Sequence, residues 1–270
     1  MGPVTDAQGI QLPSIAILGA GSMGGAILQG LLQPGVTVTG GIRITNRRPG
    51  RGPEGVTAYA LEEDPEANRR AVEGAGIVLV GVKPAGVGDL LDEIAGALEP
   101  GTLVISVAAG VPLSAIERRL PPSVAAVRAM PNTPATVGLA VTGISPGSRA
   151  TAEQTALART LFATVGEVLE VTEDRIDALS TISGSGPAYV FYLVEQLQEA
   201  ARQRGFDAEE SALLVQGTFR GALELLRTSG LPPRSSAAAS RARTAPPSAR
   251  SRSWSKPTWP PPSTTRQPPR

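Results

Sequence analysis

The fold is decided by residues 14–24, which read Ser14-Ile15-Ala16-Ile17-Leu18-Gly19-Ala20-Gly21-Ser22-Met23-Gly24. The first five predict a buried β-strand, and a helix is predicted at 23–32. The glycines form the pattern G-x-G-x-x-G, which gives a tight turn, room for a pyrophosphate and close helix–strand packing. The helix N-terminus then offers free N–H groups to phosphates. We therefore expect a dinucleotide here, the alternative being a purely structural glycine-rich turn.

Strand and helix signals alternate over residues 13–172, which indicates one α/β domain. Apolar, β-branched runs predict strands at 14–18, 42–45, 77–82, 102–107, 124–129, 139–145 and 167–171. Helices are predicted between them, at 23–32, 65–73, 87–98, 114–120 and 151–164. Such alternation is typical of a doubly wound parallel sheet with helices on both faces. Residues 1–12 show no clear period, and we expect them to form a loose leader.

The strand signals stop after residue 172, and three helices are predicted at 173–183, 187–204 and 208–229. The last carries Leu213, Leu214, Gly217, Gly221 and Leu225 at helical spacing. This stripe fits ordinary core packing or a subunit interface. We expect residues 173–233 to form a small, partial helical domain.

The charge is unevenly distributed along the 270 residues. The whole chain carries 25 basic and 24 acidic residues, but residues 1–233 have 17 and 24, a net charge of −7. Residues 234–270 have eight basic residues, eight prolines and no acidic residue, Leu, Ile, Val, Met, Phe or Tyr. A segment of this composition cannot bury enough apolar surface to fold, so we expect it to be disordered.

The composition excludes several classes of site. The chain has no Cys and no His, which removes thiol nucleophiles, disulfides, His-based triads and His-ligated zinc. We expect no metal site. No apolar run approaches the ~20 residues of a membrane helix, and the N-terminus lacks a signal-peptide pattern. We expect a cytoplasmic protein with no membrane or nucleic-acid partner.

The end of the second predicted strand distinguishes between cofactors. An acidic residue there would bind the adenosine ribose and repel a 2′-phosphate. This chain has Asn46, Arg47 and Arg48 instead. The guanidinium groups favour NADPH, with NADH left open; solvated loop charges are the alternative.

Three other segments stand at strand or helix ends. Val82-Lys83-Pro84 and residues 106–110 follow strands at the edge where open α/β sheets bind ligands. Residues 128–134 form a turn-rich strand exit, and taken alone all these exits favour a structural interpretation. Residues 183–189 place two Ser and two Gly before a helix that starts near Pro187, with Ser185 as the expected N-cap. Hydroxyls and free N–H groups there suit a small carboxylate, and a plain capped helix start is the alternative.

Taken together and in this order, these segments resemble pyrroline-5-carboxylate reductase over about residues 14–233. The resemblance implies an N-terminal Rossmann domain, a helical dimerisation domain and a homo-oligomer. It also implies reduction of 1-pyrroline-5-carboxylate to L-proline, the last step of proline biosynthesis, by hydride transfer to a cyclic imine. The protonated imine needs no His base, because the cofactor supplies the hydride. No catalytic residue is assigned.

The resemblance also implies which residues bind. The cofactor would contact Gly19, Ala20, Gly21, Ser22, Met23, Gly24, Asn46, Arg47, Asn68, Val82, Lys83, Pro84, Val107, Ala108 and Ala109. The substrate would lie near Glu173, Ser183, Gly184, Ser185, Gly186 and Pro187.

One other enzyme class stays open. A β-hydroxyacid dehydrogenase would need a Lys in the helical region, but the only lysines are Lys83 and Lys256.

The resemblance ends near Pro233, where the family continues with an active-site loop and further helices. The Arg-, Ala-, Pro- and Ser-rich residues 234–270 are typical of GC-rich DNA translated out of frame, and we expect a frameshift there; a genuine basic tail is the alternative. We therefore expect this chain to bind NADPH weakly or to dimerise poorly, with impaired activity. A non-catalytic nucleotide-binding remnant or regulatory protein is the alternative.

Overall fold

The computed structural model describes residues 9–50 and 52–236, which fall into two compact units. The first unit ends at Tyr192 and the second begins at Leu193, so the division lies inside helix α7 (Gly186–Arg202). The sequence-based boundary lies twenty residues earlier, at 172/173. It differs because helix α6 (Glu173–Leu179) packs on the sheet of the first unit, where Ile176 is fully buried.

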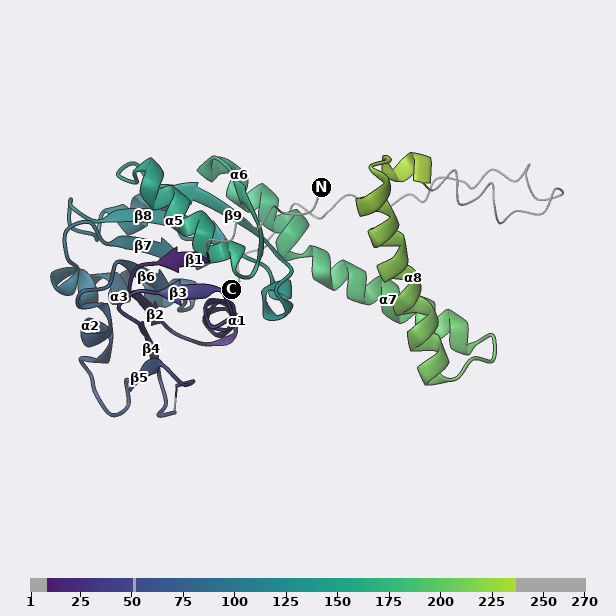
Figure 1. Cartoon of the computed structure of the whole chain (residues 1–270), viewed down its shortest axis with the longest axis horizontal. Helices are drawn as coiled ribbons and strands as arrows, with labels where there is room; N and C mark the ends of the chain where they lie inside the picture. The colour runs from purple at the N-terminus through teal and green to yellow at the C-terminus, as the bar shows by residue number, and fades with distance from the viewer. Residues whose placement is uncertain (1–8, 51, 237–270) are drawn as a thin grey trace, which may run out of the picture. The chain divides into compact units, whose positions relative to one another are not determined.

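An eight-stranded sheet forms the centre of the first unit (Figure 1). The strand order is β10-β9-β8-β7-β6-β2-β4-β5, and every neighbouring pair is parallel except β8 and β9. The strands are β2 (Ile15–Leu18), β4 (Ile42–Asn46), β5 (Val56–Ala60), β6 (Ile77–Val80), β7 (Leu103–Ser106), β8 (Ala125–Met130), β9 (Ala140–Pro146) and β10 (Gly166–Glu170). From β5 to β8 the order is that of dinucleotide-binding sheets, with the switch point between β2 and β6. The predicted doubly wound sheet is confirmed.

The helices cover both faces of this sheet because its strands alternate between two cores. Ile15 and Ile17 of β2 contribute to one core, with α1 (Ser22–Leu31) and α5 (Ala152–Ala163). Ala16 and Leu18 contribute to the other, with α2 (Ala67–Val72), α3 (Val87–Ile94) and α4 (Leu113–Glu117). This two-residue alternation explains why the buried strands read as continuous apolar runs.

Three strands were not predicted from the sequence. Besides β5, these are β1 (Ile10–Leu12) and β3 (Val36–Val38), which pair in parallel as a separate two-stranded sheet. The loose leader predicted at 1–12 is therefore wrong for residues 10–12, because Leu12 is buried in the core that contains α1. Residues 1–8 lie outside the described part of the chain.

The helix predicted at 173–183 is not a single α-helix. It consists of α6 followed by a π-helical turn, η4 (Ser180–Gly184), and α7 begins two residues later. The local widening of the helix at η4 falls in the Ser- and Gly-rich stretch.

Three short 3-10 turns complete the described part of the first unit. Two of them, η1 (Pro84–Gly86) and η2 (Ala95–Ala97), flank α3, and η3 (Thr133–Val137) follows β8.

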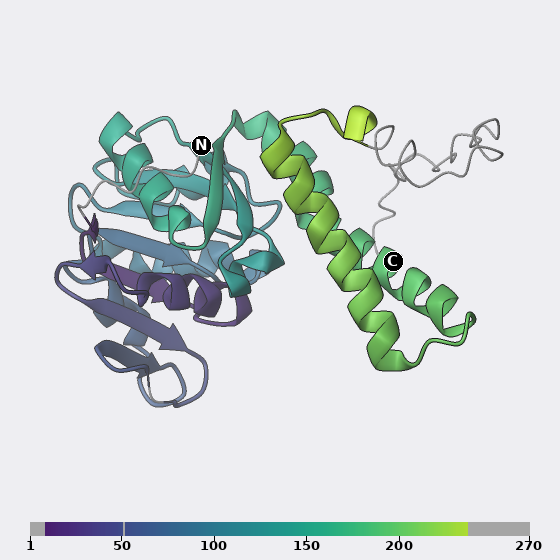
Figure 2. The ribbon, with the colours of Figure 1, turned by 45° about the vertical axis from the view of Figure 1, so that its right-hand side comes forward.

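The second unit contains the end of α7 and helix α8 (Ala208–Ser229), joined by a short turn (Figure 2). A capping box between Asp207 and Glu210 starts α8, and Gly230 ends it in the left-handed region with φ +63°. Only Ser211 and Val215 of α8 are buried in the described structure.

The expected disorder and frameshift concern residues 234–270, of which only 234–236 are described. These three residues belong to a helical turn at 233–236, so disorder is wrong for them; residues 237–270 lie outside the described part. Among the described helices, none combines the length and apolar character that a bilayer crossing requires.

Candidate functional site

The nucleotide loop leaves β2 in a conformation that depends on glycine. Gly19 has φ +85° and donates its N–H to the carbonyl oxygen of Thr45 on neighbouring β4 at 3.1 Å. A Cβ at position 24 would lie 2.6 Å from the Gly19 carbonyl oxygen, closer than carbon and oxygen can approach. The first and third motif glycines therefore allow the tight turn and the close seat of α1 on β2 that the pattern predicts.

The N-terminus of α1 has the character of a phosphate site. Gly21 is its N-cap residue, no side chain caps it, and its first turn carries no acidic residue. A Cβ at position 21 would meet no atom within 4 Å, so the space beside this residue is open. The free N–H groups and positive end of the helix dipole therefore face open space that an anion can enter.

Asn46, Arg47 and Arg48 stand at the carboxyl end of β4, beside this loop in the sheet. Both arginines are exposed, and neither forms an ion pair within the described residues. The Arg47 carbonyl oxygen accepts the N–H of Glu62 at 3.1 Å, which fixes the backbone while leaving the guanidinium group free. The geometry thus leaves two cations available to a ligand phosphate.

The exits of β6 and β7 complete this edge of the sheet. Gly81 donates its N–H to the Leu18 carbonyl oxygen at 2.8 Å, which brings Val82 beside Gly19. Lys83 and Pro84 follow on the exposed surface, and Ala108 of the β7 exit is buried. The predicted cofactor segments at the β2, β4, β6 and β7 exits therefore share the carboxyl edge of parallel strands.

Asn68 lies in a different environment from the other predicted cofactor residues. It is buried in α2, and its Nδ2 donates to Glu93 of α3 at 3.2 Å. One of its two amide N–H groups is therefore engaged, which leaves the other N–H and the Oδ1 for a ligand.

Glu173, a predicted substrate residue, joins three elements of the first unit. Its Oε1 accepts the backbone N–H of Leu113 at 2.6 Å and lies 3.4 Å from Nη1 of Arg128. Arg128 also donates through Nη2 to Asp177 at 2.7 Å, and its side chain is only 6% exposed. The contacts of Glu173 are therefore structural ones between α6, β8 and the start of α4.

The remaining substrate candidates, Ser183, Gly184, Ser185, Gly186 and Pro187, span the end of η4 and the start of α7. The Ser185 carbonyl oxygen accepts the N–H of Ala188 at 3.1 Å, as a residue at a helix start does. Its own N–H, however, donates to the Ser180 carbonyl oxygen at 3.1 Å. The expected cluster of unpaired N–H groups is thus smaller than the sequence indicated, because the π-turn uses this one.

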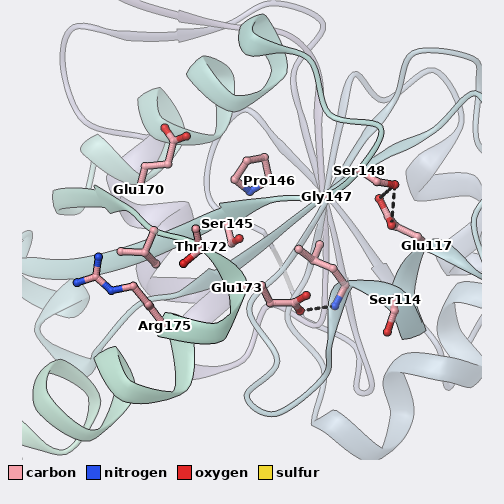
Figure 3. A pocket seen from close by; sticks show the side chains of 12 residues that line it. Ser114, Glu117, Ser145, Pro146, Gly147, Ser148, Glu170, Thr172, Glu173 and Arg175 are labelled. Carbon is pink, nitrogen blue, oxygen red and sulfur yellow. Dashed lines mark hydrogen bonds between the residues drawn. The ribbon is translucent and has the colours of Figure 1, made fainter.

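A pocket opens next to Glu173 on the first unit (Figure 3). Figure 3 marks a hydrogen bond at the Glu173 carboxylate and one between Ser148 and Glu117. Glu173 accepts the Leu113 N–H, and the Ser148 hydroxyl donates to Glu117 at 3.0 Å. None of the residues from Gly19 to Gly24 lines this pocket. It is lined by Leu113, Ser114, Glu117, Ser145, Pro146, Gly147, Ser148, Glu170, Val171, Thr172, Glu173 and Arg175.

The charge and side-chain types of the site limit its chemistry. In residues 9–50 and 52–236, no three Asp or Glu side chains are grouped to hold a metal ion. The strand edge instead offers backbone N–H groups, two free arginines and Lys83. Such a set can bind and orient an anionic dinucleotide.

Taken alone, the sequence of the β8 exit, residues 128–134, favours a structural role. The structure shows that Arg128 and Asn132 contact the predicted substrate segments: Arg128 binds Glu173, and Asn132 binds the Ser183 backbone. A signal was present, since Pro187 cannot donate the helical N–H that Ser183 would accept.

Two family models match separate parts of the chain. Residues 173–246 match the model described as pyrroline-5-carboxylate reductase dimerisation, which extends beyond Pro233, where the sequence resemblance was expected to end. Residues 14–110 match the model described as NADP oxidoreductase, coenzyme F420-dependent.

Full-length relatives agree with these matches. The chain is 35% identical over 225 residues to pyrroline-5-carboxylate reductase of Corynebacterium melassecola, covering 82% of this chain and 83% of the relative. It is 37% identical over 218 residues to the Mycobacterium tuberculosis enzyme of that name, covering 78% and 73%.

Solved structures give the same result. A pyrroline-5-carboxylate reductase from Coxiella burnetii superposes with a TM-score of 0.75 at 33% identity, covering 86% of this chain and 85% of that one. The Plasmodium falciparum pyrroline carboxylate reductase with NADP bound has the same fold, with a TM-score of 0.75 at 24% identity and coverage of 89% and 87%. With its dinucleotide-binding sheet, its glycine loop and these relatives over most of their length, the chain belongs to the pyrroline-5-carboxylate reductase family.

Proposed function

We propose that this chain reduces 1-pyrroline-5-carboxylate to L-proline, with NADPH as the preferred reductant and NADH as the second donor. The observation that carries the proposal is the glycine loop, where Gly24 permits close packing on Gly19 and the α1 N-terminus faces open space. Membership of the family supports the reductase over a β-hydroxyacid dehydrogenase and over a non-catalytic remnant.

The described residues fit the dinucleotide. The N–H groups at Gly21, Ser22 and Met23 would bind the pyrophosphate, and Arg47 and Arg48 would bind the 2′-phosphate. The exits at Val82, Lys83, Pro84, Val107, Ala108 and Ala109 would hold the nicotinamide half. When bound, the reduced nicotinamide supplies the hydride that the imine carbon accepts.

The protein's own contribution is binding and orientation. The α7 N-terminus, with no acidic residue in its first turn, would receive the substrate carboxylate through the segment from Ser183 to Pro187. The proton on the imine nitrogen arrives with the substrate, which fits a chain that has no His. Holding the imine carbon against the hydride donor is then the main catalytic effect.

We also propose that the enzyme is a homo-oligomer and acts in the cytoplasm. In the described structure no residue of α7 is buried and apolar side chains of α8 are exposed, as a partner helix face requires. The family-model match to a dimerisation region supports a second copy of this chain as that partner.

The test is an assay on the purified 270-residue protein. Loss of NADPH absorbance that depends on pyrroline-5-carboxylate is the expected result, and NADPH binding is measured separately by fluorescence. Tight NADPH binding without turnover would favour the non-catalytic nucleotide-binding protein. Absence of both would refute the proposal.

A further inference from the structure

We propose that Asn132 is a positioning residue that holds the Ser183–Pro187 segment in the shape that receives the substrate carboxylate. The inference rests on the proposed function for the identity of that ligand. The contacts that carry it all lie within the first unit and do not depend on the ligand.

Asn132 joins three segments through one buried amide. Its Nδ2 donates to the Ser183 carbonyl oxygen at 3.0 Å, and its Oδ1 accepts the N–H of Val141 on β9 at 3.0 Å. The residue itself lies directly after β8 and is 7% exposed. Both ends of the amide are therefore satisfied, and its orientation is determined by the two bonds.

The bond to Ser183 replaces one that the helix cannot make. In a continuous α-helix, the Ser183 carbonyl oxygen would accept the N–H of the residue four positions later. That residue is Pro187, which has no N–H. Asn132 supplies the missing donor from another part of the chain, so Pro187 can stand in the first turn of α7 while the Ser183 carbonyl stays paired.

Neighbouring contacts show that this end of the segment is closely packed. A Cβ at Gly184 would lie 3.1 Å from Ser180 Oγ and 3.6 Å from the Met130 methyl group. Met130 is the last residue of β8, two positions before Asn132. The Met130 methyl group thus limits the space beside Gly184, and Asn132 donates a hydrogen bond to the same segment.

The consequence is a selective effect on substrate. Without the amide donor, the partly buried Ser183 carbonyl is left unpaired and the π-turn loses its link to β9. The segment then samples other shapes, which weakens substrate binding. The nucleotide loop shares no hydrogen bond with Asn132, so cofactor affinity is expected to stay the same.

The first experiment compares wild type with Asn132→Asp and Asn132→Ala in the full chain. Amide hydrogen exchange over residues 180–189 should accelerate in both variants, and KM for pyrroline-5-carboxylate should rise about tenfold, as for one lost hydrogen bond. The Kd for NADPH should change less than about twofold. Thr136→Ala is the control, because its exposed Oγ1 bonds only Thr133 of the same turn, at 3.0 Å.

The second experiment adds a donor where proline prevents one. Pro187→Ala provides an N–H four residues after Ser183, so the double variant Asn132→Ala/Pro187→Ala should recover part of the slow exchange lost in Asn132→Ala. If Asn132 had a merely structural role, its variants would lower the free energy of unfolding and accelerate exchange throughout the sheet, with no selective rescue.

The outcomes separate the two proposals. Unchanged exchange at 180–189 in both Asn132 variants, or an equal loss of NADPH and substrate binding, would overturn the positioning role. If wild type shows no turnover, the exchange data and the rescue still decide the role of Asn132, while the proposed reductase activity fails by itself.

Discussion

The Glu173 carboxylate accepts the backbone N–H of Leu113 at 2.6 Å, although the residues are sixty positions apart. The same oxygen lies 3.4 Å from Nη1 of Arg128, whose guanidinium group is almost completely buried. One carboxylate therefore satisfies a helix-start N–H and part of a buried cation. Through it, α6, which leads into the substrate segment, is tied to α4, which follows the β7 exit.

This arrangement predicts that losing Glu173 destabilises the fold more than losing Asp177. The ion-pair distances alone would predict the opposite order. Asp177 makes the shorter contact with Arg128, 2.7 Å, but its side chain is 78% exposed, whereas that of Glu173 is 34% exposed. We expect Glu173→Ala to cost about 2 kcal/mol, because it leaves Leu113 and part of Arg128 unpaired. Asp177→Ala should cost less than about 1 kcal/mol.

Denaturant unfolding measures both values, and Glu173→Gln is the internal control. The glutamine oxygen still accepts the Leu113 N–H, so this variant should fall between the other two. A larger loss for Asp177→Ala than for Glu173→Ala would contradict the assignment.

The glycine loop predicts that folding and binding can be separated. At Gly24 an added methyl group would meet the Gly19 carbonyl oxygen at 2.6 Å, so Gly24→Ala should lower both the free energy of unfolding and NADPH affinity. At Gly21 the methyl group meets no protein atom within 4 Å. Gly21→Ala should therefore fold with normal stability while NADPH affinity falls about tenfold or more, because the methyl group occupies phosphate space.

Thermal unfolding without ligand and NADPH titration by fluorescence check this pair. Equal stability of the two variants would show that α1 does not depend on the close approach at Gly24. Unchanged NADPH affinity in Gly21→Ala would show that no phosphate group of the cofactor binds at this loop.

The strands that could be predicted from the sequence are those whose residues form continuous apolar runs. The runs ending at Leu18 and Val80 are buried on both faces, so their apolar continuity could be read directly as parallel strands. Strand β1 could not be predicted in this way, because Ile10, Gln11 and Leu12 are too short a segment and become a strand only by pairing with Val36, Thr37 and Val38. This pairing depends on the tertiary structure and cannot be read from the spacing of residues in the sequence.

The site shows the same division. The glycine loop was predictable because turn geometry and residue type are linked at Gly19 and Gly24. The contacts of Glu173 with Leu113 and of Asn132 with Ser183 were not, because they join residues sixty and fifty-one positions apart. Such contacts depend on tertiary packing, which a single sequence leaves undetermined.

The exposed arginines at the β4 end predict cofactor preference. Arg47→Asp and Arg48→Asp, singly and together, should raise the Kd for NADPH about tenfold to a hundredfold, the range for lost charge-assisted hydrogen bonds. The Kd for NADH, which lacks the 2′-phosphate, should change little. Arg118→Asp, an exposed position at the end of α4, controls for the change in net charge. Equal effects on both dinucleotides would reject a 2′-phosphate site.

Helix α8 predicts a pH-sensitive surface pair. The Arg227 guanidinium hydrogen-bonds the Glu224 carboxylate and lowers the pKa of Glu224 below its ordinary value, 4.5. Because the pKa of Glu224 is lower in the folded state than in the unfolded state, the pair stabilises the fold at pH values above the unfolded-state pKa. This stabilisation is lost as the pH falls through the folded-state pKa. In Arg227→Gln the pKa of Glu224 should rise toward 4.5, as measured by carboxyl-carbon NMR titration. No change in that pKa would mean that the pair is absent in solution.

The apolar side chains of α8 predict self-association. Leu213 and Leu225 are 76% and 58% exposed, and the helix between them carries Gly217 and Gly221, which allow a partner helix to approach closely. We expect Leu213→Asp and Leu225→Asp to shift the protein toward monomer, because each places a carboxylate in an apolar contact. Ala156→Asp introduces the same charge at an exposed position of α5 and should leave the assembly unchanged. Sedimentation equilibrium over a range of concentrations measures the shift; monomeric wild type, or equal behaviour of all three variants, would show that this face has no second copy as its partner.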